Sequence, residues 1–139
     1  MCTKVYNNLN TMKKISQTYH ISAPAEEVWK ALTDPKYIER WGGGPAEMSD
    51  KKGFEFSLWG GDIYGKNIEV IKGKLLVQEW FGGKWDKSSR ATFNLHSKGD
   101  KTTIKFIHTD IPDSEHADIE QGWKDYYLGP LKDFLEKRS

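Results

Sequence analysis

Hydrophobic and polar residues follow two different periods along this chain. Between residues 53 and 109, apolar residues recur at every second position in short runs separated by Gly-rich turns, which predicts a meander of strands. Beyond the meander, apolar residues recur every three or four positions, which predicts one long helix over Asp113–Lys137. Pro130 inside this helix predicts a break after Tyr127 or Leu128. The residues of the helix expected to face the core are Ile119, Trp123, Tyr126, Tyr127, Pro130, Leu131, Phe134 and Leu135.

The segment before the meander predicts one strand and two short helices. Alternation over Ile15–Ile21 predicts the strand, and the apolar positions of SAPAEEVWKALTDP predict a helix that stops at Asp34-Pro35. A second short helix over Tyr37–Trp41 ends at a run of glycines. Residues 1–12 are polar and show no period, so we expect a flexible tail followed by a single domain over residues 13–139.

Short turns determine how these elements assemble. The strands of the meander are joined by two to five residues, too few for parallel crossovers, so the sheet must be antiparallel. The stretch GGDIYG at residues 60–65 predicts a hairpin turn with a close-packed Gly65, because a strand and not a helix follows it. Only one helix is long enough to cover the sheet. The predicted fold class is therefore α+β: a curved antiparallel sheet of about six strands around a long C-terminal helix, with two short helices after the first strand.

Composition and charge exclude several function classes. Lys plus Arg number 21 and Asp plus Glu 20, a net charge of +1, so no basic field would attract nucleic acid or an anionic membrane. No apolar run approaches the ~20 residues of a membrane span, and the N-terminus lacks the apolar core of a signal peptide. The one cysteine, Cys2, excludes an internal disulfide and fits a reducing compartment. We expect a cytoplasmic protein.

The histidines do not form a metal site. His20, His96, His108 and His116 show no pair at metal-ligand spacing, so we expect neither a metal nor another cofactor. His96 and His108 are expected to face each other across the last hairpin as a surface pair.

Carboxylates and serines do not indicate catalysis. Glu69 or Glu79 could turn inward from a strand, but exposed carboxylates are the expectation, and acid–base catalysis needs a second placed group. Ser88 and Ser89 belong to no His–acid motif. No catalytic residue is predicted, and the function is expected to be non-enzymatic.

Three segments together resemble a known family. The segments FEFSLWGGDIYGKNIEVIKGKLLVQEW, DKSSRATFNLHSKGDKTTIKFIHTDIPDSE and GWKDYYLGPLKDFL resemble the C-terminal domain of the activators of heat-shock protein 90 ATPase. ALTDP at residues 31–35 matches the same family and the wider START-like, Bet v 1-like superfamily (SRPBCC), and the resemblance covers about Ile15–Leu135. It implies a helix-grip fold and either a co-chaperone that binds a heat-shock protein 90 type chaperone and stimulates its ATPase or a stand-alone domain of unassigned role. The eukaryotic activators carry a further N-terminal domain, for which 139 residues leave no room, so a stand-alone, co-chaperone-like protein-binding module is expected.

Aromatic residues suggest two kinds of binding site. In the wider superfamily a cavity between sheet and helix holds lipids, sterols or polyketides, and a binder or carrier of a small hydrophobic ligand is the alternative function. The expected lining here is Trp41, Phe56, Leu58, Tyr64, Trp123 and Tyr127. Core packing is the competing role for these rings, and it carries the greater weight. Trp59 and Trp85, near turns, are expected to be exposed anchors for a protein partner.

Overall fold

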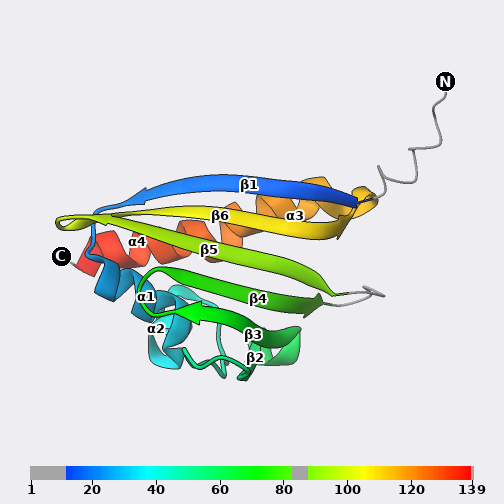
Figure 1. The fold of residues 1–139 in the computed structure, drawn as a ribbon, viewed down its shortest axis with the longest axis horizontal. Helices are drawn as coiled ribbons and strands as arrows, with labels where there is room; N and C mark the ends of the chain where they lie inside the picture. Colours follow the sequence, from blue (N-terminus) through cyan, green and yellow to red (C-terminus); the bar gives the residue numbers. More distant parts are fainter. Residues whose placement is uncertain (1–11, 83–87, 139) are drawn as a thin grey trace.

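The computed structural model describes residues 12–82 and 88–138, and within them six strands form one antiparallel sheet (Figure 1). The strands are β1 (Met12–Ile21), β2 (Glu55–Leu58), β3 (Ile63–Ile71), β4 (Leu75–Gly82), β5 (Ser89–Lys98) and β6 (Lys101–Pro112), in the spatial order β1-β6-β5-β4-β3-β2. The helices are α1 (Ala25–Thr33), α2 (Pro35–Trp41), α3 (His116–Gly122) and α4 (Leu128–Arg138). The predicted α+β fold is confirmed. The expected tail lies outside the described residues, apart from Met12, which begins β1.

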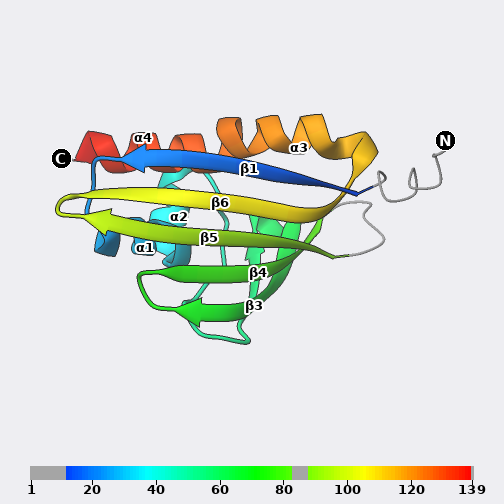
Figure 2. The same ribbon diagram turned by 45° about the horizontal axis from the view of Figure 1, so that its top comes forward.

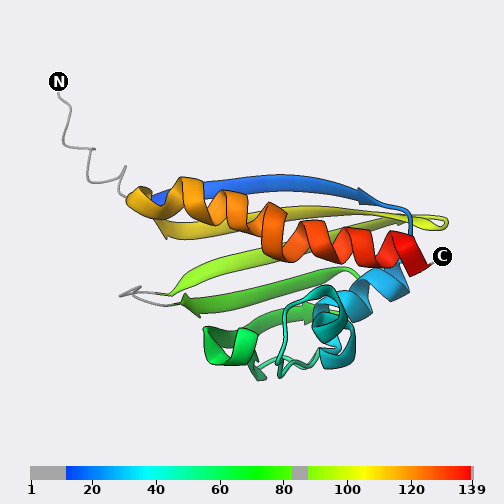
Figure 3. The ribbon, with the colours of Figure 1, turned by 180° about the vertical axis from the view of Figure 1, so that it is seen from behind.

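The long C-terminal helix lies on one face of the sheet. Figure 3 shows α3 and α4 as one long helix that runs nearly along the strands, with α1 and α2 near its C-terminal end. Figure 2 shows the same helix along the β1 and β6 side of the sheet, and the Gln17 side chain of β1 donates a 2.9 Å hydrogen bond to the Glu120 carbonyl of α3. The opposite face of the sheet is the one seen in Figure 1.

The two short helices follow from local signals in the sequence. Asp34 ends α1, and its side chain accepts a 2.9 Å hydrogen bond from the Lys36 amide at the start of α2. Pro35 occupies the first turn of α2, where its missing N–H costs nothing. Gly42 ends α2 with a φ of 110°, a left-handed conformation that favours glycine.

Aromatic rings and leucines fill the space between sheet and helix. Every second residue of a strand points to the helices, and Phe93 of β5 lies opposite Phe106 of β6 with ring centroids 5.0 Å apart. Leu128, Leu131 and Leu135 bury the facing side of the helix. The expectation that most large rings pack as core is confirmed by this arrangement.

A π-helical turn, Trp123–Tyr127, joins α3 to α4 just where Pro130 predicted a break. Proline offers no N–H to the carbonyl four residues earlier, and a widened turn in front of it accommodates that loss. The wider turn shifts the phase of the helix, so that Leu128 is fully buried whereas Tyr126 is 67% exposed. The prediction that Tyr126 faces the core is therefore wrong.

A β-bulge in β3 changes which of its residues face the helices. The pairing of β3 with β4 shifts between Asn67 and Glu69, so the alternation does not continue across this point. Val70 packs against the core, but Tyr64, which simple alternation would put on the same face, is 52% exposed and stacks on Phe81. The prediction that Tyr64 lines a cavity beneath the helix is wrong for this reason.

The turn between β2 and β3 agrees with its sequence. Residues 59–61 form a single 3₁₀ turn that reverses the chain into the hairpin. At Gly65, a Cβ atom would overlap the carbonyl oxygen of Glu79 on the neighbouring strand and come within 2.9 Å of the Phe56 ring. The close packing predicted for Gly65 is confirmed, because only glycine leaves room for this approach.

Candidate binding pocket between the sheet and the C-terminal helix

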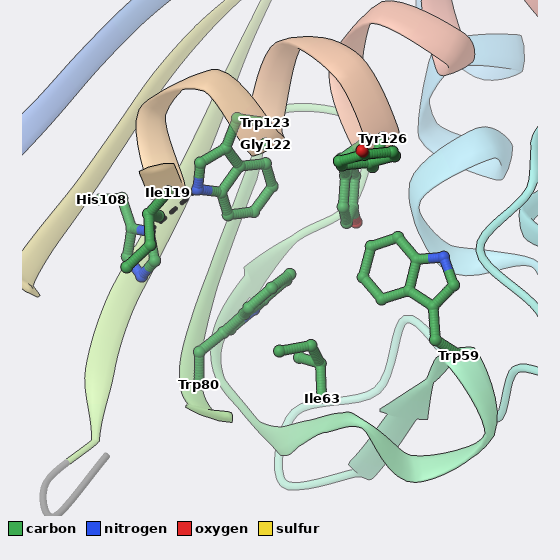
Figure 4. Close-up of a pocket in the computed structure, with 9 residues that line it drawn as sticks. Trp59, Ile63, Trp80, His108, Ile119, Gly122, Trp123 and Tyr126 are labelled. Atoms are coloured by element: carbon green, nitrogen blue, oxygen red, sulfur yellow. Dashed lines mark hydrogen bonds between the residues drawn. The ribbon is translucent and has the colours of Figure 1, made fainter. Parts of the chain in front are cut away.

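A cavity of about 190 Å³ lies between the sheet and the π-helical turn (Figure 4). Figure 4 shows Trp80 and Ile63 on the sheet side, Ile119 and Trp123 on the helix side, and Trp59 at the turn between β2 and β3. The full lining is Trp59, Ile63, Trp80, His108, Ile119, Gly122, Trp123, Tyr126 and Tyr127. The wall is thus mostly aromatic, and its volume is below the ~300 Å³ at which pockets for drug-sized ligands begin.

The π-helical turn brings the helical part of this wall together. Trp123 and Tyr127 are buried side by side, with ring centroids 4.7 Å apart, and Trp80 of β4 lies 4.8 Å from Trp123. Tyr126 lies at the rim, where it is largely exposed. Short π-helical segments are frequent at functional sites because they change the direction in which side chains project.

Each indole N–H that borders the cavity already has an acceptor. Trp59 Nε1 donates to the Gly42 carbonyl at 2.8 Å, Trp80 Nε1 to Gln78 Oε1 at 2.8 Å, and Trp123 Nε1 to His108 Nδ1 at 3.0 Å. The three tryptophans therefore offer ring surface to the cavity and no free donor.

His108 is fully buried, and its hydrogen bonds determine its tautomer. Because Nδ1 accepts from Trp123, the proton of the neutral ring is on Nε2, which lies 2.7 Å from Ser89 Oγ and donates to it. Ser89 Oγ in turn donates to the Trp80 carbonyl at 3.4 Å. Burial lowers the pKa of His108 from 6.5 to about 3, so the ring is neutral at pH 7.

Ser89 and His108 are as close together as a catalytic nucleophile and its general base, but the hydrogen bond between them runs in the opposite direction. A general base must accept the proton of the serine hydroxyl, whereas His108 Nε2 donates to it. The second ring nitrogen contacts Trp123 where a catalytic triad would hold a carboxylate, and Ser89 is only 2% exposed. The pair therefore serves to connect β5, β6 and the helix.

The expected pairing of His96 with His108 is wrong. In the register of β5 and β6, His96 lies opposite Thr103, and Ala91 lies opposite His108. His96 is exposed, whereas His108 points to the core. The offset between the two strands could not be read from alternation alone.

A second buried polar network lies behind Trp80. Gln78 Nε2 donates to Asn67 Oδ1 at 2.9 Å, and Asn67 Nδ2 donates to the carbonyls of Ser49 at 2.8 Å and Lys51 at 3.0 Å. This network connects the loop before β2 to the sheet beneath the cavity. The sequence analysis did not predict this network, although Gln78 lies on the same face of β4 as the buried Leu76 and Trp80.

Besides Tyr64, which lies on the outer face, the other five residues predicted to line the cavity divide into two groups. Trp123 and Tyr127 do border it. Trp41, Phe56 and Leu58 are buried in the adjoining core and are not among its lining residues. Whether any of them binds a ligand stays a prediction.

The two predicted partner anchors fare differently. Trp59 is partly buried, and its ring lies 6.2 Å from that of Tyr127, so it forms part of the cavity wall. Whether it also contacts a protein partner stays a prediction. Trp85 lies outside the described residues. Glu69 is exposed and Glu79 accepts a 3.0 Å hydrogen bond from Ser88 on the outer face, in agreement with the expectation for strand carboxylates.

Among residues 12–82 and 88–138, no group of three or more His, Cys, Asp or Glu side chains could hold a metal ion. In the same part of the chain, no helix has both the length and the apolar character needed to cross a bilayer.

The curved sheet, the C-terminal helix that packs on it and the aromatic cavity between them together define a helix-grip domain. Residues 22–136 match the family described as activator of Hsp90 ATPase homolog 1-like protein. The chain belongs to this family.

Similar proteins differ in how much of their length this chain covers. It is 29% identical to an uncharacterised protein of Schizosaccharomyces pombe, over 85% of this chain and 36% of that protein. It is 25% identical to the activator of 90 kDa heat shock protein ATPase homolog of Dictyostelium discoideum, over 94% of this chain and 36% of that one. The chain thus spans about a third of the length of these relatives.

Solved structures of similar size share the fold. The crystal structure of an HSP90 activator from Plasmodium falciparum superposes with a TM-score of 0.81 at 27% identity, covering 88% of this chain and 95% of that one. The solution structure of the Aha1 dimer from Colwellia psychrerythraea superposes with a TM-score of 0.76 at 22% identity, covering 89% of this chain and 96% of that one. At this identity the likeness is one of fold alone.

Proposed function

We propose that this protein binds an Hsp90-type chaperone as a stand-alone module and stimulates its ATPase. The observation that carries the proposal is the likeness to the HSP90 activator of Plasmodium falciparum, which extends over nearly the whole of that chain. That structure is named for an activator, and its chain is about as long as this one, which supports activation by a module of this size.

The outer face of the sheet supplies the contact surface in this proposal. Tyr64 and Ile71 of β3 are both more than half exposed, and each lies opposite an apolar residue of β4: Tyr64 opposite Phe81, and Ile71 opposite Leu75. We call these four residues the β3–β4 face. The two pairs lie near opposite ends of the β3–β4 ladder, with charged residues such as Lys66 between them. Aromatic residues contribute most of the binding energy in protein contact sites, so Tyr64 is the expected centre of the contact.

Tyr64→Ser is expected to reduce the stimulation of chaperone ATP turnover about 5-fold or more at a fixed, subsaturating concentration, because loss of a central aromatic contact commonly costs more than 1 kcal/mol of binding. The measurement is a steady-state ATPase assay of an Hsp90-type chaperone with increasing amounts of wild type or variant. Tyr126→Ser is the comparison, since it removes an exposed ring from the helix side of the molecule.

Two results would contradict the proposal at different levels. If excess wild-type protein leaves ATP turnover unchanged and titration calorimetry detects no complex, chaperone binding is wrong. If Tyr126→Ser abolishes stimulation while Tyr64→Ser does not, the β3–β4 face is wrong and the chaperone contacts the helix side.

The aromatic cavity favours a second candidate function, the binding of a small hydrophobic ligand. Its volume of about 190 Å³ is too small for the lipids, sterols or polyketides held by the wider superfamily. Its lining is nevertheless continuous ring surface, which an apolar molecule of lower volume would contact on several sides. A rise in melting temperature on adding small aromatic compounds, but not lipids, is the expected result.

A further inference from the structure

We propose that a second copy of this chain binds to the outer face of the sheet, with the two copies related by a two-fold axis between β3 and β4. The strands β2, β3, β4 and β5 lie side by side on this face (Figure 1). The inference concerns self-association, so the pairing depends neither on chaperone binding nor on the aromatic cavity.

Four charged side chains form a row across these four strands. The row consists of Glu55 of β2, Lys66 of β3, Glu79 of β4 and Arg90 of β5, each lying directly opposite the next in the strand pairing. Residues directly opposite each other share a face of the sheet. Glu79 is partly exposed and the other three are exposed. The charges alternate in sign along the row, and we call these four residues the charge row.

A row of four alternating charges is complementary to itself under a two-fold rotation. An axis perpendicular to the sheet, midway between Lys66 and Glu79, reverses the order of the row in the second copy. Lys66 then faces Glu79 of the second copy, and Glu55 faces its Arg90, so all four contacts join opposite charges. An axis through Lys66 itself would instead place like charges opposite each other. The alternation thus selects one alignment of the two sheets.

The same axis also brings apolar side chains together. Tyr64 and Val77 lie on opposite sides of the charge row, because each precedes a member of the row by two residues and their strands are antiparallel. The axis exchanges β3 with β4, so Tyr64 of each copy is placed over Val77 of the other. Tyr64 is 52% exposed and Val77 is partly exposed, so these contacts bury apolar surface that water covers in the single chain.

Cross-strand charges can also stabilise the sheet of a single chain. Within residues 12–82 and 88–138, however, no carboxylate of the charge row forms an ion pair with a cation of the row, and Glu79 accepts its hydrogen bond from Ser88. A partner whose charges are all of one sign would be repelled by half of the row. A second copy, by contrast, necessarily carries the matching order of charges.

One consequence rests on the chaperone binding proposed above. Pairing of two copies covers Tyr64, the expected centre of the chaperone contact, so self-association should compete with the chaperone. Stimulation per molecule should therefore fall at protein concentrations above the Kd of self-association. If the chaperone does not bind at all, this consequence is lost and the pairing remains.

Sedimentation velocity of the full chain without chaperone tests the pairing. The wild type is expected to self-associate reversibly at about 20 mM NaCl with a Kd of roughly 10 to 500 μM, the range of weak complexes. At about 500 mM NaCl the association should be ~5-fold weaker or more, because salt screens exposed charges.

Charge reversal at the centre of the row gives the sharpest result. Lys66→Glu and Glu79→Lys each place like charges at both central contacts, so each variant alone should associate ~10-fold more weakly or less. An equimolar mixture of the two variants should recover the wild-type association, because every contact between the two different chains joins opposite charges. A folding defect cannot produce this recovery.

Lys105→Glu is the matched control. It makes the same change in net charge as Lys66→Glu at an exposed position of β6 outside the charge row, and it should associate as the wild type does.

Three results would overturn the inference. A wild type that stays monomeric up to about 500 μM at low salt removes the pairing altogether. A mixture that associates as weakly as the single variants contradicts the two-fold alignment of the charge row. If Lys105→Glu weakens association as much as Lys66→Glu does, net charge and not the charge row controls self-association.

Discussion

Gly129→Ala is expected to lower the free energy of unfolding by about 3 kcal/mol or more. Gly129 lies in α4 directly after the π-helical turn, and a Cβ atom there would overlap the carbonyl oxygen of Lys124. Because the overlapped atom belongs to the backbone, no change of rotamer relieves the contact and the turn itself must rearrange. The same turn carries Trp123 and Tyr127, so the cavity wall should be disturbed together with the stability.

Gly122→Ala at the other end of the turn is the matched control. Its added Cβ would find its nearest neighbour, in the Tyr126 ring, at 4.0 Å, which is an ordinary contact. Since alanine is the better helix former, this variant should be as stable as the wild type or more stable by up to ~1 kcal/mol. Urea unfolding curves of the three proteins provide the measurement. Equal midpoints for the two variants would contradict the role assigned to Gly129 in the turn.

Acidification from pH 7 to pH 5 is expected to lower the free energy of unfolding by about 2 kcal/mol through His108 alone. Its pKa is about 3 in the folded protein, against 6.5 for an unperturbed histidine. Between these values the unfolded chain binds a proton that the folded protein does not. The stabilisation is therefore complete above pH 6.5 and is lost progressively as the pH falls toward 3.

Two variants separate this effect from other titrating groups. His108→Gln should show a flatter dependence of stability on pH between 7 and 5, although it is less stable overall because Trp123 and Ser89 lose their partner. His96→Gln, which removes an exposed histidine of β5, is the matched comparison. The pKa of Glu136 is lowered from 4.5, chiefly by a hydrogen bond from the Ser22 amide. The stability that Glu136 contributes is therefore lost only below pH 5, outside the range measured here. A wild-type stability that stays constant from pH 7 to pH 5 would contradict the buried neutral state of His108.

Sequence patterns predicted the architecture because its main determinants are local. Alternation along the strands, the Asp34-Pro35 stop between the short helices and the stripe that includes Trp123 and Tyr127 are all visible without knowledge of tertiary contacts. The close packing at Gly65 was also predictable, since a glycine inside a strand indicates a near approach of backbone.

The prediction failed where an extra residue changed the phase of an element. The bulge between Asn67 and Glu69 turned Tyr64 to the outer face, and the π-helical turn exposed Tyr126. Neither a bulge nor a widened turn leaves a distinct periodic signal. The contact of His108 with Ser89 and Trp123 depends on the register of β5 and β6 and on the placement of the helix, which are tertiary properties.

Binding of an Hsp90-type chaperone to the β3–β4 face is tested most directly by the isoleucine methyl signals of the labelled protein during titration with unlabelled chaperone. Ile71 is 51% exposed on this face, Ile63 borders the cavity and Ile104 is fully buried in the core. The signal of Ile71 is predicted to shift or broaden saturably, while those of Ile63 and Ile104 keep their positions. A titration in which Ile71 does not respond, whether because no signal changes or because only Ile63 does, would contradict the proposed interface.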